Sequence, residues 1–326
     1  MEAPMSEPAP LFIDSARYFG AGRPERLEDR LSITVTARAF PPYLDDLKED
    51  WVASVAIPAF RTLERRRPGT VGAFCSIGTG TGLDALGAIE VFGARRVGIT
   101  DVHDEVVSTA AANIRGNLRD PASVRLLAGT GDLLSPLASE GPRFDVIYEN
   151  LPNVPLDDGS QLEKDRVSSS FFPARREVVP EDLKANLLTL HYVALVQAKD
   201  FLAPAGIVLS MLGGRVPLEV FLDMSRLAGY RPRFLSYGWK IQAEAEDVLS
   251  GYAAWQRHGL GPFHFYHEPD VAAAFAGLDP VDAAANALAI ERDLAPRSLD
   301  AEAAYAAFKG GERIAHTYAV LESALE

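Results

Sequence analysis

The sequence predicts an α/β fold in which strands alternate with helices around one central sheet. Apolar runs of strand length recur along the chain, and stretches with helical spacing of apolar residues separate most of them. In the clearest case, an apolar run at 71–77 passes through a glycine-rich turn into a helical pattern at 83–91. A strand that turns through glycines into a helix is typical of a nucleotide-binding corner.

The other elements follow in a regular order around this corner. Before it, a tail at 1–10 precedes a helical pattern at 47–66, which Pro58 should kink or split. After it, the alternation of apolar runs and helical spacing predicts strands at 95–100, 123–128, 144–148 and 206–212, and helices at 104–118, 181–202 and 217–228.

Towards the C-terminus the pattern becomes less regular. Strands at 233–241 and 262–267 should form an antiparallel edge hairpin, and alanine-rich helices and a final apolar stretch at 316–321 follow them. The sequence therefore predicts three parts, which are a tail and helical cap at 1–68, a core at 69–268 and a C-terminal helical extension at 269–326.

Composition and charge narrow the classes of function. Apolar residues make up 48% of the chain and charged residues 24%, which are ordinary values for a globular protein that buries a large core. The formal net charge is −13. Proteins that bind nucleic-acid phosphates nonspecifically need clustered Lys and Arg. We therefore expect no nucleic-acid partner.

Cysteine and histidine usage gives no sign of a metal or a disulfide. Cys75 is the only cysteine, so the chain forms no internal disulfide and no cysteine-based zinc site. His191, His264 and His267 lack metal-ligand spacing with convincing partners, so we interpret them as structural or surface residues.

The chain shows no targeting or membrane segment. Its first residues have neither the positive charge nor the apolar stretch of a secretory signal. No apolar run reaches the roughly 20 residues that cross a bilayer. We expect a cytoplasmic protein with no membrane partner.

The glycine corner carries the first candidate binding residues. Gly78, Gly80 and Gly82 follow the pattern G-x-G-x-G, whereas a dinucleotide fingerprint needs G-x-G-x-x-G. Without Cβ atoms, glycines let a ligand lie against bare backbone, and the N-terminus of the next helix offers unpaired N–H groups. A plain structural turn is the alternative interpretation.

Asp101 ends the next predicted strand. An acidic residue about 20 residues beyond such glycines is placed to accept hydrogen bonds from ribose hydroxyls. Aspartate is also favoured as a helix N-cap, and a helical pattern begins near His103. The two roles are compatible, and the preceding glycine loop favours ribose binding.

In this order, the features resemble those of class I S-adenosylmethionine (SAM) methyltransferases over residues 69–268. The resemblance implies a Rossmann-like, doubly wound sheet of seven mostly parallel strands, and SAM as the cofactor. It assigns Asp132 to the adenine amino group and Leu133 to the adenine face, although an exposed turn aspartate is the other interpretation. Ser76 stands where the family usually has an acidic residue that helps hold the amino-acid end of SAM.

A second motif follows the strand at 144–148. The stretch Asn150-Leu151-Pro152-Asn153 resembles the Asn-Pro-Pro-Tyr motif of amide, DNA-base and release-factor glutamine N-methyltransferases. Leu151 replaces the first proline, and Asn153 replaces the aromatic residue that would stack on a planar amide or base. The resemblance implies that Asn150 and a neighbouring carbonyl orient an amine for methylation. We therefore expect an amine of a small molecule as the acceptor, with an Asn-Pro turn as the structural alternative.

The same residues also fit a different reaction. With Ser76 in place of the acid, Asn150 or Asn153 together with Tyr148 could hold the SAM amine and direct it at the γ-carbon of the same molecule. Closure would release methylthioadenosine and yield azetidine-2-carboxylate, and azetidine-2-carboxylate synthases are similar to this architecture. A noncatalytic SAM-binding module is a third hypothesis. An NAD-dependent oxidoreductase is a fourth, which the glycine spacing disfavours.

The sequence leaves the roles of two segments open. The polar connection at 156–179 contains Arg175 and Arg176, either of which could clamp a carboxylate or stay solvated in a loop. The C-terminal extension could dock on the core, form a lid or make the contact of a homodimer.

Overall fold

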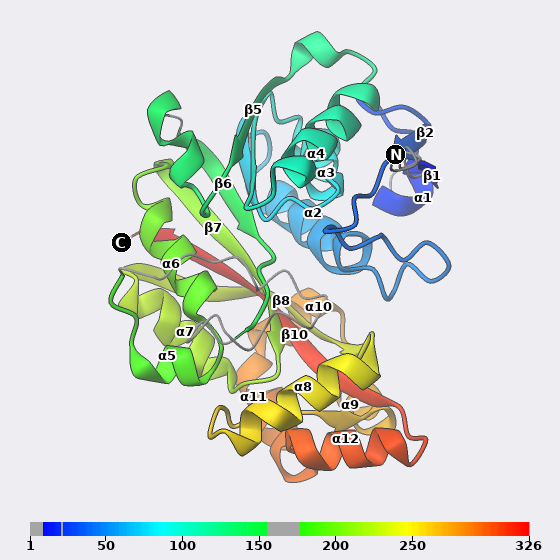
Figure 1. Ribbon diagram of the computed structural model, residues 1–326, viewed down its shortest axis with the longest axis vertical. Helices are drawn as coiled ribbons and strands as arrows, with labels where there is room; N and C mark the ends of the chain where they lie inside the picture. Colours follow the sequence, from blue (N-terminus) through cyan, green and yellow to red (C-terminus); the bar gives the residue numbers. More distant parts are fainter. Residues whose placement is uncertain (1–8, 21, 142, 155–176, 326) are drawn as a thin grey trace, which may run out of the picture. The chain divides into compact units, whose positions relative to one another are not determined.

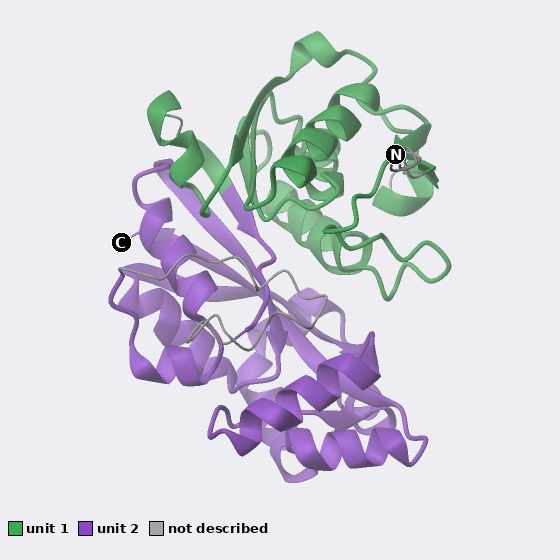
Figure 2. Cartoon of the chain, in the orientation of Figure 1, with its two compact units in different colours: residues 1–146 green, residues 147–326 purple. Residues whose placement is uncertain are grey.

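The structure is a computed structural model that describes residues 9–20, 22–141, 143–154 and 177–325. The chain divides into two compact units, residues 1–146 and 147–326, which Figure 2 colours separately. The main sheet has the strand order β5-β4-β3-β6-β7-β10-β8, with the short β9 paired to β10. The predicted α/β fold with a mostly parallel central sheet is confirmed.

The elements of unit 1 alternate as the sequence predicts from residue 73 onward (Figure 1). In order, the unit contains β1 (Leu11–Asp14), α1 (Ser15–Phe19), β2 (Arg30–Ile33), the π-helix η1 (Val52–Ala56), α2 (Ile57–Arg66), β3 (Ala73–Ile77), α3 (Leu83–Phe92), β4 (Arg96–Asp101), α4 (Asp104–Gly116), the 3₁₀ turn η2 (Pro121–Ser123), β5 (Arg125–Thr130), the 3₁₀ helix η3 (Ser135–Glu140) and the start of β6 (Phe144–Glu149).

Three parallel strands form the centre of unit 1. β3 runs beside β4 from Ala73 opposite Arg96, and β4 runs beside β5 from Arg96 opposite Arg125. All five residues of β3 are buried, as a strand covered on both faces requires. Because the strands are parallel, their carboxyl ends meet at one edge, and the loops that follow all three strands start there.

Close packing in this sheet explains the glycine at position 98 and the small side chain of Cys75. A Cβ at Gly98 of β4 would lie 2.7 Å from the Phe144 ring and 3.0 Å from the Cys75 sulfur. Cys75 is fully buried, and this burial raises the pKa of its thiol well above the usual value. Cys75 therefore acts as a small apolar residue of the core.

The segment before β3 is less helical than the sequence suggests. It begins with a two-stranded antiparallel sheet of β1 and β2, in which Leu11 pairs with Ile33. The helical pattern at 47–66 becomes η1 followed by α2, and the change of helix type falls just before Pro58. Pro58 lies in the first turn of α2, directly after the π-helix.

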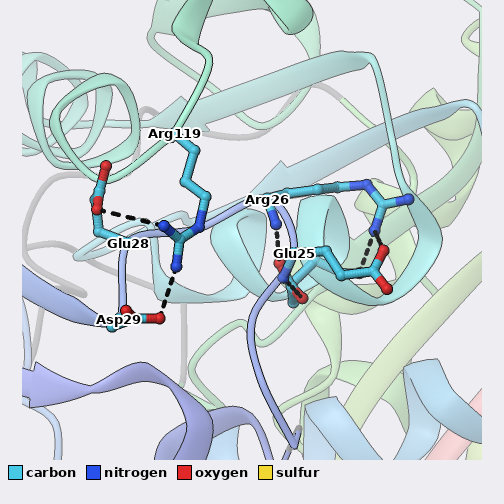
Figure 3. Close-up of polar contacts among 6 residues, drawn as sticks. Glu25, Arg26, Glu28, Asp29 and Arg119 are labelled. Carbon is cyan, nitrogen blue, oxygen red and sulfur yellow. Dashed lines mark hydrogen bonds and ion pairs between the residues drawn. The ribbon is translucent and has the colours of Figure 1, made fainter.

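Polar side chains fasten this segment to the rest of unit 1. Glu90 of α3 accepts hydrogen bonds from the backbone N–H groups of Glu25 and Arg26, at 2.8 and 2.9 Å. Figure 3 shows these contacts together with Arg119, which lies between Glu28 and Asp29 and approaches Asp29 to 2.6 Å. The exposed ion pair adds little stability, whereas the buried carboxylate of Glu90 fixes the course of the backbone.

Unit 2 completes the sheet and adds a group of helices. In order, it contains the end of β6, then α5 (Glu181–Ala185), α6 (Thr189–Ala198), β7 (Leu202–Gly214), α7 (Leu218–Leu227), β8 (Tyr230–Ile241), α8 (Ala245–Arg257), β9 (Tyr266–His267), α9 (Glu268–Ala274), α10 (Pro280–Ala285), α11 (Ala287–Leu294), the 3₁₀ turn η5 (Ala295–Arg297), α12 (Ala301–Lys309) and β10 (Ile314–Leu325). α8 and α12 lie side by side (Figure 1).

The last strand of the sheet is not where the sequence places it. Of the predicted strand at 262–267, only Tyr266 and His267 form β9. The strand is instead β10, which runs antiparallel between β7 and β8 and includes the apolar stretch at 316–321. Its first ten residues are buried. A strand buried on both faces reads as a continuous apolar run, which periodicity cannot separate from a buried helix.

One predicted helix forms two separate helices in the structure. The pattern at 181–202 forms α5 and α6, and Leu187 between them adopts a φ of 61°. Within the ranges that the structure describes, no helix combines the length and apolar character needed to cross a bilayer.

Candidate active site

The glycine loop lies between β3 and α3, as the sequence predicts. Gly78, Gly80 and Gly82 have φ values of 68°, 52° and 84°, in the left-handed region that favours glycine. The backbone N–H groups of Gly78 and Thr79 donate to the carbonyl of Thr100, at 2.9 and 3.0 Å. The loop is therefore tied to the end of β4, beside Asp101.

The glycines differ in what surrounds them. A Cβ at Gly82 would lie 3.2 Å from Ile114 and 3.3 Å from the carbonyl of Ala110, both in α4. A Cβ at Gly80 would meet nothing within 4 Å. Gly82 is thus required by helix packing, whereas Gly80 faces open space in which a ligand could lie against the backbone.

Ser76 has a partner that the sequence analysis missed. Its hydroxyl hydrogen-bonds to the carboxylate of Asp84, in the first turn of α3, and Asp84 also accepts from the N–H of Ala85 at 2.7 Å. Burial raises the pKa of Asp84 to about 6. A carboxylate thus stands next to Ser76 although position 76 itself is not acidic. The sequence shows that Asp84 is an acidic residue near the start of the predicted helix, but it does not indicate the contact with Ser76.

Asp101 lies at the end of β4 and receives backbone hydrogen bonds. Its carboxylate accepts from the N–H of His103 at 3.1 Å, and Gly80 makes a further backbone hydrogen bond to it. Burial raises the pKa of this carboxyl, and these hydrogen bonds oppose the rise. The N-cap of α4 is His103, so Asp101 braces the turn before the helix rather than capping it.

The turn after Asp101 also brings in a residue from the N-terminal segment. Arg38 Nη1 lies 3.0 Å from His103 Nδ1. Because a guanidinium only donates, Nδ1 accepts this hydrogen bond and the ring proton of the neutral imidazole is on Nε2. Arg38 also approaches Glu105 to 3.6 Å. No local pattern signals this contact, because it joins residues 65 positions apart.

The loop after β5 places Asp132 and Leu133 at the same edge of the sheet. The carbonyl of Asp132 accepts from the N–H and the hydroxyl of Ser135, at 3.0 and 2.6 Å. The Asp132 residue is half-buried, whereas Leu133 is only 3% exposed and adopts a φ of 47°. Their assignments to adenine stay predictions.

The residues of the second motif lie in unit 2. Asn150 directly follows β6 and is exposed, while Pro152 and Asn153 are half-buried. Tyr148 is buried within the strand, at 1% exposure. Arg175 and Arg176 lie outside the described residues.

Directly before Asn150, Glu149 forms a buried pair with His191 of α6. His191 Nδ1 lies 2.9 and 2.8 Å from the two carboxylate oxygens, and both side chains are fully buried. One of these oxygens also accepts from the N–H of Leu151 at 3.2 Å. The pair therefore holds the backbone on both sides of Asn150. Among the described residues, no group of three or more His, Cys, Asp or Glu side chains could hold a metal ion.

Comparisons with known proteins find similarity in solved structures only. No family model matches the sequence, and the comparison with curated proteins gives no match. A methyltransferase from Pyrococcus furiosus is 19% identical, with a TM-score of 0.38 and coverage of 56% of this chain and 77% of that chain. A ribosomal protein L11 methylase from Lactobacillus delbrueckii subsp. bulgaricus is 18% identical, with a TM-score of 0.35 and coverage of 55% and 70%.

A third structure contains bound ligands. The 16S rRNA N2 G1207 methyltransferase of T. thermophilus, in complex with AdoMet and guanosine, is 14% identical, with a TM-score of 0.42 and coverage of 72% of this chain and 49% of that chain. At these identities and TM-scores the similarities assign neither a family nor a substrate to this chain.

Proposed function

We propose that this protein is a SAM-dependent enzyme that transfers a methyl group to an amine of a small molecule. The observation that carries the proposal is the convergence of three loops at the carboxyl ends of β3, β4 and β5 in unit 1. They bring an open glycine backbone at Gly80 close to the carboxylate of Asp101. Such edges of open α/β sheets bind nucleoside cofactors.

The residues present fit SAM in chemical type. Gly80 leaves space for a ligand against the backbone, and Asp101 offers carboxylate oxygens to ribose hydroxyls. Asp132 and Leu133 would contact the adenine ring by its amino group and its face. Ser76, backed by the carboxylate of Asp84, would lie towards the amino-acid end.

The chemistry needs alignment more than acid–base catalysis. When bound, SAM supplies a methyl carbon attached to a positively charged sulfur. Asn150 would accept a hydrogen bond from the acceptor amine and turn the nitrogen lone pair towards the methyl carbon. A neutral amine needs no strong base for this step, which suits an exposed asparagine held in place by the buried Glu149–His191 pair.

Intramolecular cyclisation of SAM to azetidine-2-carboxylate is the alternative reaction. Its main support in the sequence is the loss of the acidic residue at position 76. The contact between Ser76 and Asp84 returns a carboxylate to this neighbourhood and so favours ordinary methyl transfer.

Mass spectrometry of the purified protein with SAM as the only substrate separates the two reactions. Methyl transfer predicts that SAM stays intact until an amine acceptor is added and then becomes S-adenosylhomocysteine. Methylthioadenosine and an equal amount of a cyclic C4 amino acid, both lost in Asn150→Ala, would establish cyclisation instead. A protein that binds SAM but turns over neither alone nor with a panel of amine metabolites would be a binding module.

A further inference from the structure

Three polar residues meet at one edge of the sheet in unit 2. Arg215 directly follows β7, Gln242 directly follows β8, and His316 lies near the start of β10. Because β10 is antiparallel to both neighbours, its start lies beside their carboxyl ends, with Thr317 opposite Gly214 and Ala315 opposite Ile241. Ligands of open α/β sheets bind at this type of edge.

Neutral groups hold the guanidinium of Arg215 in place. Its Nε and Nη2 donate to the side-chain carbonyl of Gln242, at 3.0 and 2.8 Å, and Nη2 lies 3.1 Å from His316 Nε2. His316 Nδ1 lies 2.7 Å from the carbonyl of Thr317 and must donate to it, so Nε2 accepts from Arg215. The Gln242 amide in turn donates to the carbonyl of Ala243 at 2.8 Å.

None of these partners neutralises the charge. Burial, with the positive charge of Arg215 beside the ring, lowers the pKa of His316 well below its usual value, so this histidine is neutral. The Tyr252 ring, 5.4 Å from Arg215 Cζ, is also neutral. In the part of the chain that the structure describes, Arg215 forms no ion pair with a carboxylate. A half-buried cation is ordinarily paired with an anion.

The guanidinium also keeps hydrogen-bonding capacity. Of its five N–H groups, the one on Nε and the two on Nη2 account for the hydrogen bonds to Gln242 and His316. The remaining two are on Nη1, and the Tyr252 hydroxyl makes one further hydrogen bond with the guanidinium. Gly213 leaves room for Nη1, because a Cβ there would collide with this atom. An oriented cation whose five N–H groups are not all taken by neutral partners is suited to one anionic group.

We infer that Arg215, oriented by Gln242 and His316, is an anion-binding subsite for a carboxylate or phosphate group on the methyl acceptor. This inference rests on the proposed methyl transfer and narrows its substrate class to amines that also carry an acidic group, such as amino acids or aminoalkyl phosphates. The clamp that the sequence allows at Arg175 or Arg176 lies outside the described residues and stays a prediction.

The test uses small anions, because the acceptor is unidentified. Inorganic phosphate and acetate are titrated separately into the full-length protein by calorimetry, at constant ionic strength kept with chloride. We expect saturable binding of at least one anion, and at least tenfold weaker binding in Arg215→Gln and in Gly213→Ala. Arg215→Lys keeps the charge and should lose less. Arg257→Gln, which removes an exposed arginine paired with Glu302, is the matched control and should bind as wild type does.

A second titration, with SAM, tests whether Arg215 binds the anionic group of the acceptor or the carboxylate of SAM. SAM affinity should be unchanged in Arg215→Gln, and circular dichroism should show that each variant is folded. Equal anion binding by wild type and Arg215→Gln, or no saturable binding of either anion, would overturn the subsite. A parallel loss of SAM affinity would overturn its assignment to the acceptor. Failure of wild type to bind SAM would count against the proposed function while leaving the anion result independent.

Discussion

The assignment of SAM as cofactor depends most on one residue, Asp101, whose carboxylate lies at the end of β4. Backbone hydrogen bonds from His103, Gly80 and Val102 orient it, and its half-buried position limits competition from water. Hydrogen bonds to a charged group contribute about 1.5–3 kcal/mol. We therefore expect Asp101→Ala to weaken SAM binding by roughly ten- to hundredfold in calorimetry. Asp120→Ala, at an exposed turn, is the control, and unchanged affinity in Asp101→Ala would remove the ribose assignment.

Asn150 should affect the reaction rather than binding. Its side chain is exposed after β6, and its proposed partner is the acceptor amine. We expect Asn150→Ala to keep the affinity for SAM and to lower kcat, by about the 10²-fold that misplaced reacting groups cost. Calorimetry and a turnover assay on the same preparation measure the two effects. Weakened SAM affinity with normal turnover would contradict the assigned role.

The raised pKa of Asp84 predicts that the free energy of unfolding depends on pH. Burial raises its pKa from 3.8 to about 6, so between these values the folded protein holds a proton that the unfolded chain has released. Stability contributed by this group therefore falls as pH rises through that window, by about 3 kcal/mol in total at about 1.4 kcal/mol for each pKa unit. Asp84→Asn removes this penalty and can keep the contacts with Ser76 and Ala85.

The stability of Asp84→Asn relative to wild type should rise by about 1–3 kcal/mol between pH 4.5 and 7.5. Urea unfolding at both pH values measures this difference. Asp120→Asn removes a carboxylate from the surface and preserves its turn, so it is the matched control. The same difference at both pH values would show that Asp84 does not titrate in this window.

At the scale of elements, Asn113 of α4 and Asn117 at its C-cap connect the N-terminal segment to the rest of unit 1. Asn117 exchanges hydrogen bonds with the backbone of Ser32, at 2.7 and 2.9 Å. Asn113 does the same with Thr34 and also donates to the carbonyl of Thr81 in the glycine loop, at 3.0 Å. Of the two, only Asn113 also contacts the glycine loop.

This difference gives a matched pair of variants. Asn113→Ala and Asn117→Ala should each lower the free energy of unfolding by about 1–3 kcal/mol, because each loses two hydrogen bonds to the backbone of the N-terminal segment, at about 0.5–1.5 kcal/mol per bond. Asn113→Ala should in addition weaken SAM binding, whereas Asn117→Ala should not. Urea unfolding and calorimetry measure the two effects, with the exposed Asn286→Ala as the control for stability. Equal SAM affinity in the pair would show that the loop does not depend on Asn113.

At the scale of the whole molecule, the net charge bears on the class of substrate. With 45 acidic and 32 basic residues, the chain repels a phosphate backbone at long range. We expect no binding of duplex RNA at 150 mM salt in a filter assay, and no binding whose affinity falls steeply as salt is raised. Salt-dependent RNA binding would contradict the small-molecule assignment and point to a nucleic-acid substrate.

Local sequence patterns were enough to predict the elements from β3 to β6, the glycine loop and the position of Asp101 at a strand end. These depend on local patterns, because strand runs, left-handed glycines and strand-end acids are set within a few residues of chain. Tertiary structure decided the rest. β10 lies between β7 and β8, and Gln242 and His316 orient Arg215. Asp84 places its carboxylate beside Ser76. Each contact joins residues that belong to different elements. The spacing of apolar residues along the sequence does not indicate such contacts, because only folding brings those side chains together.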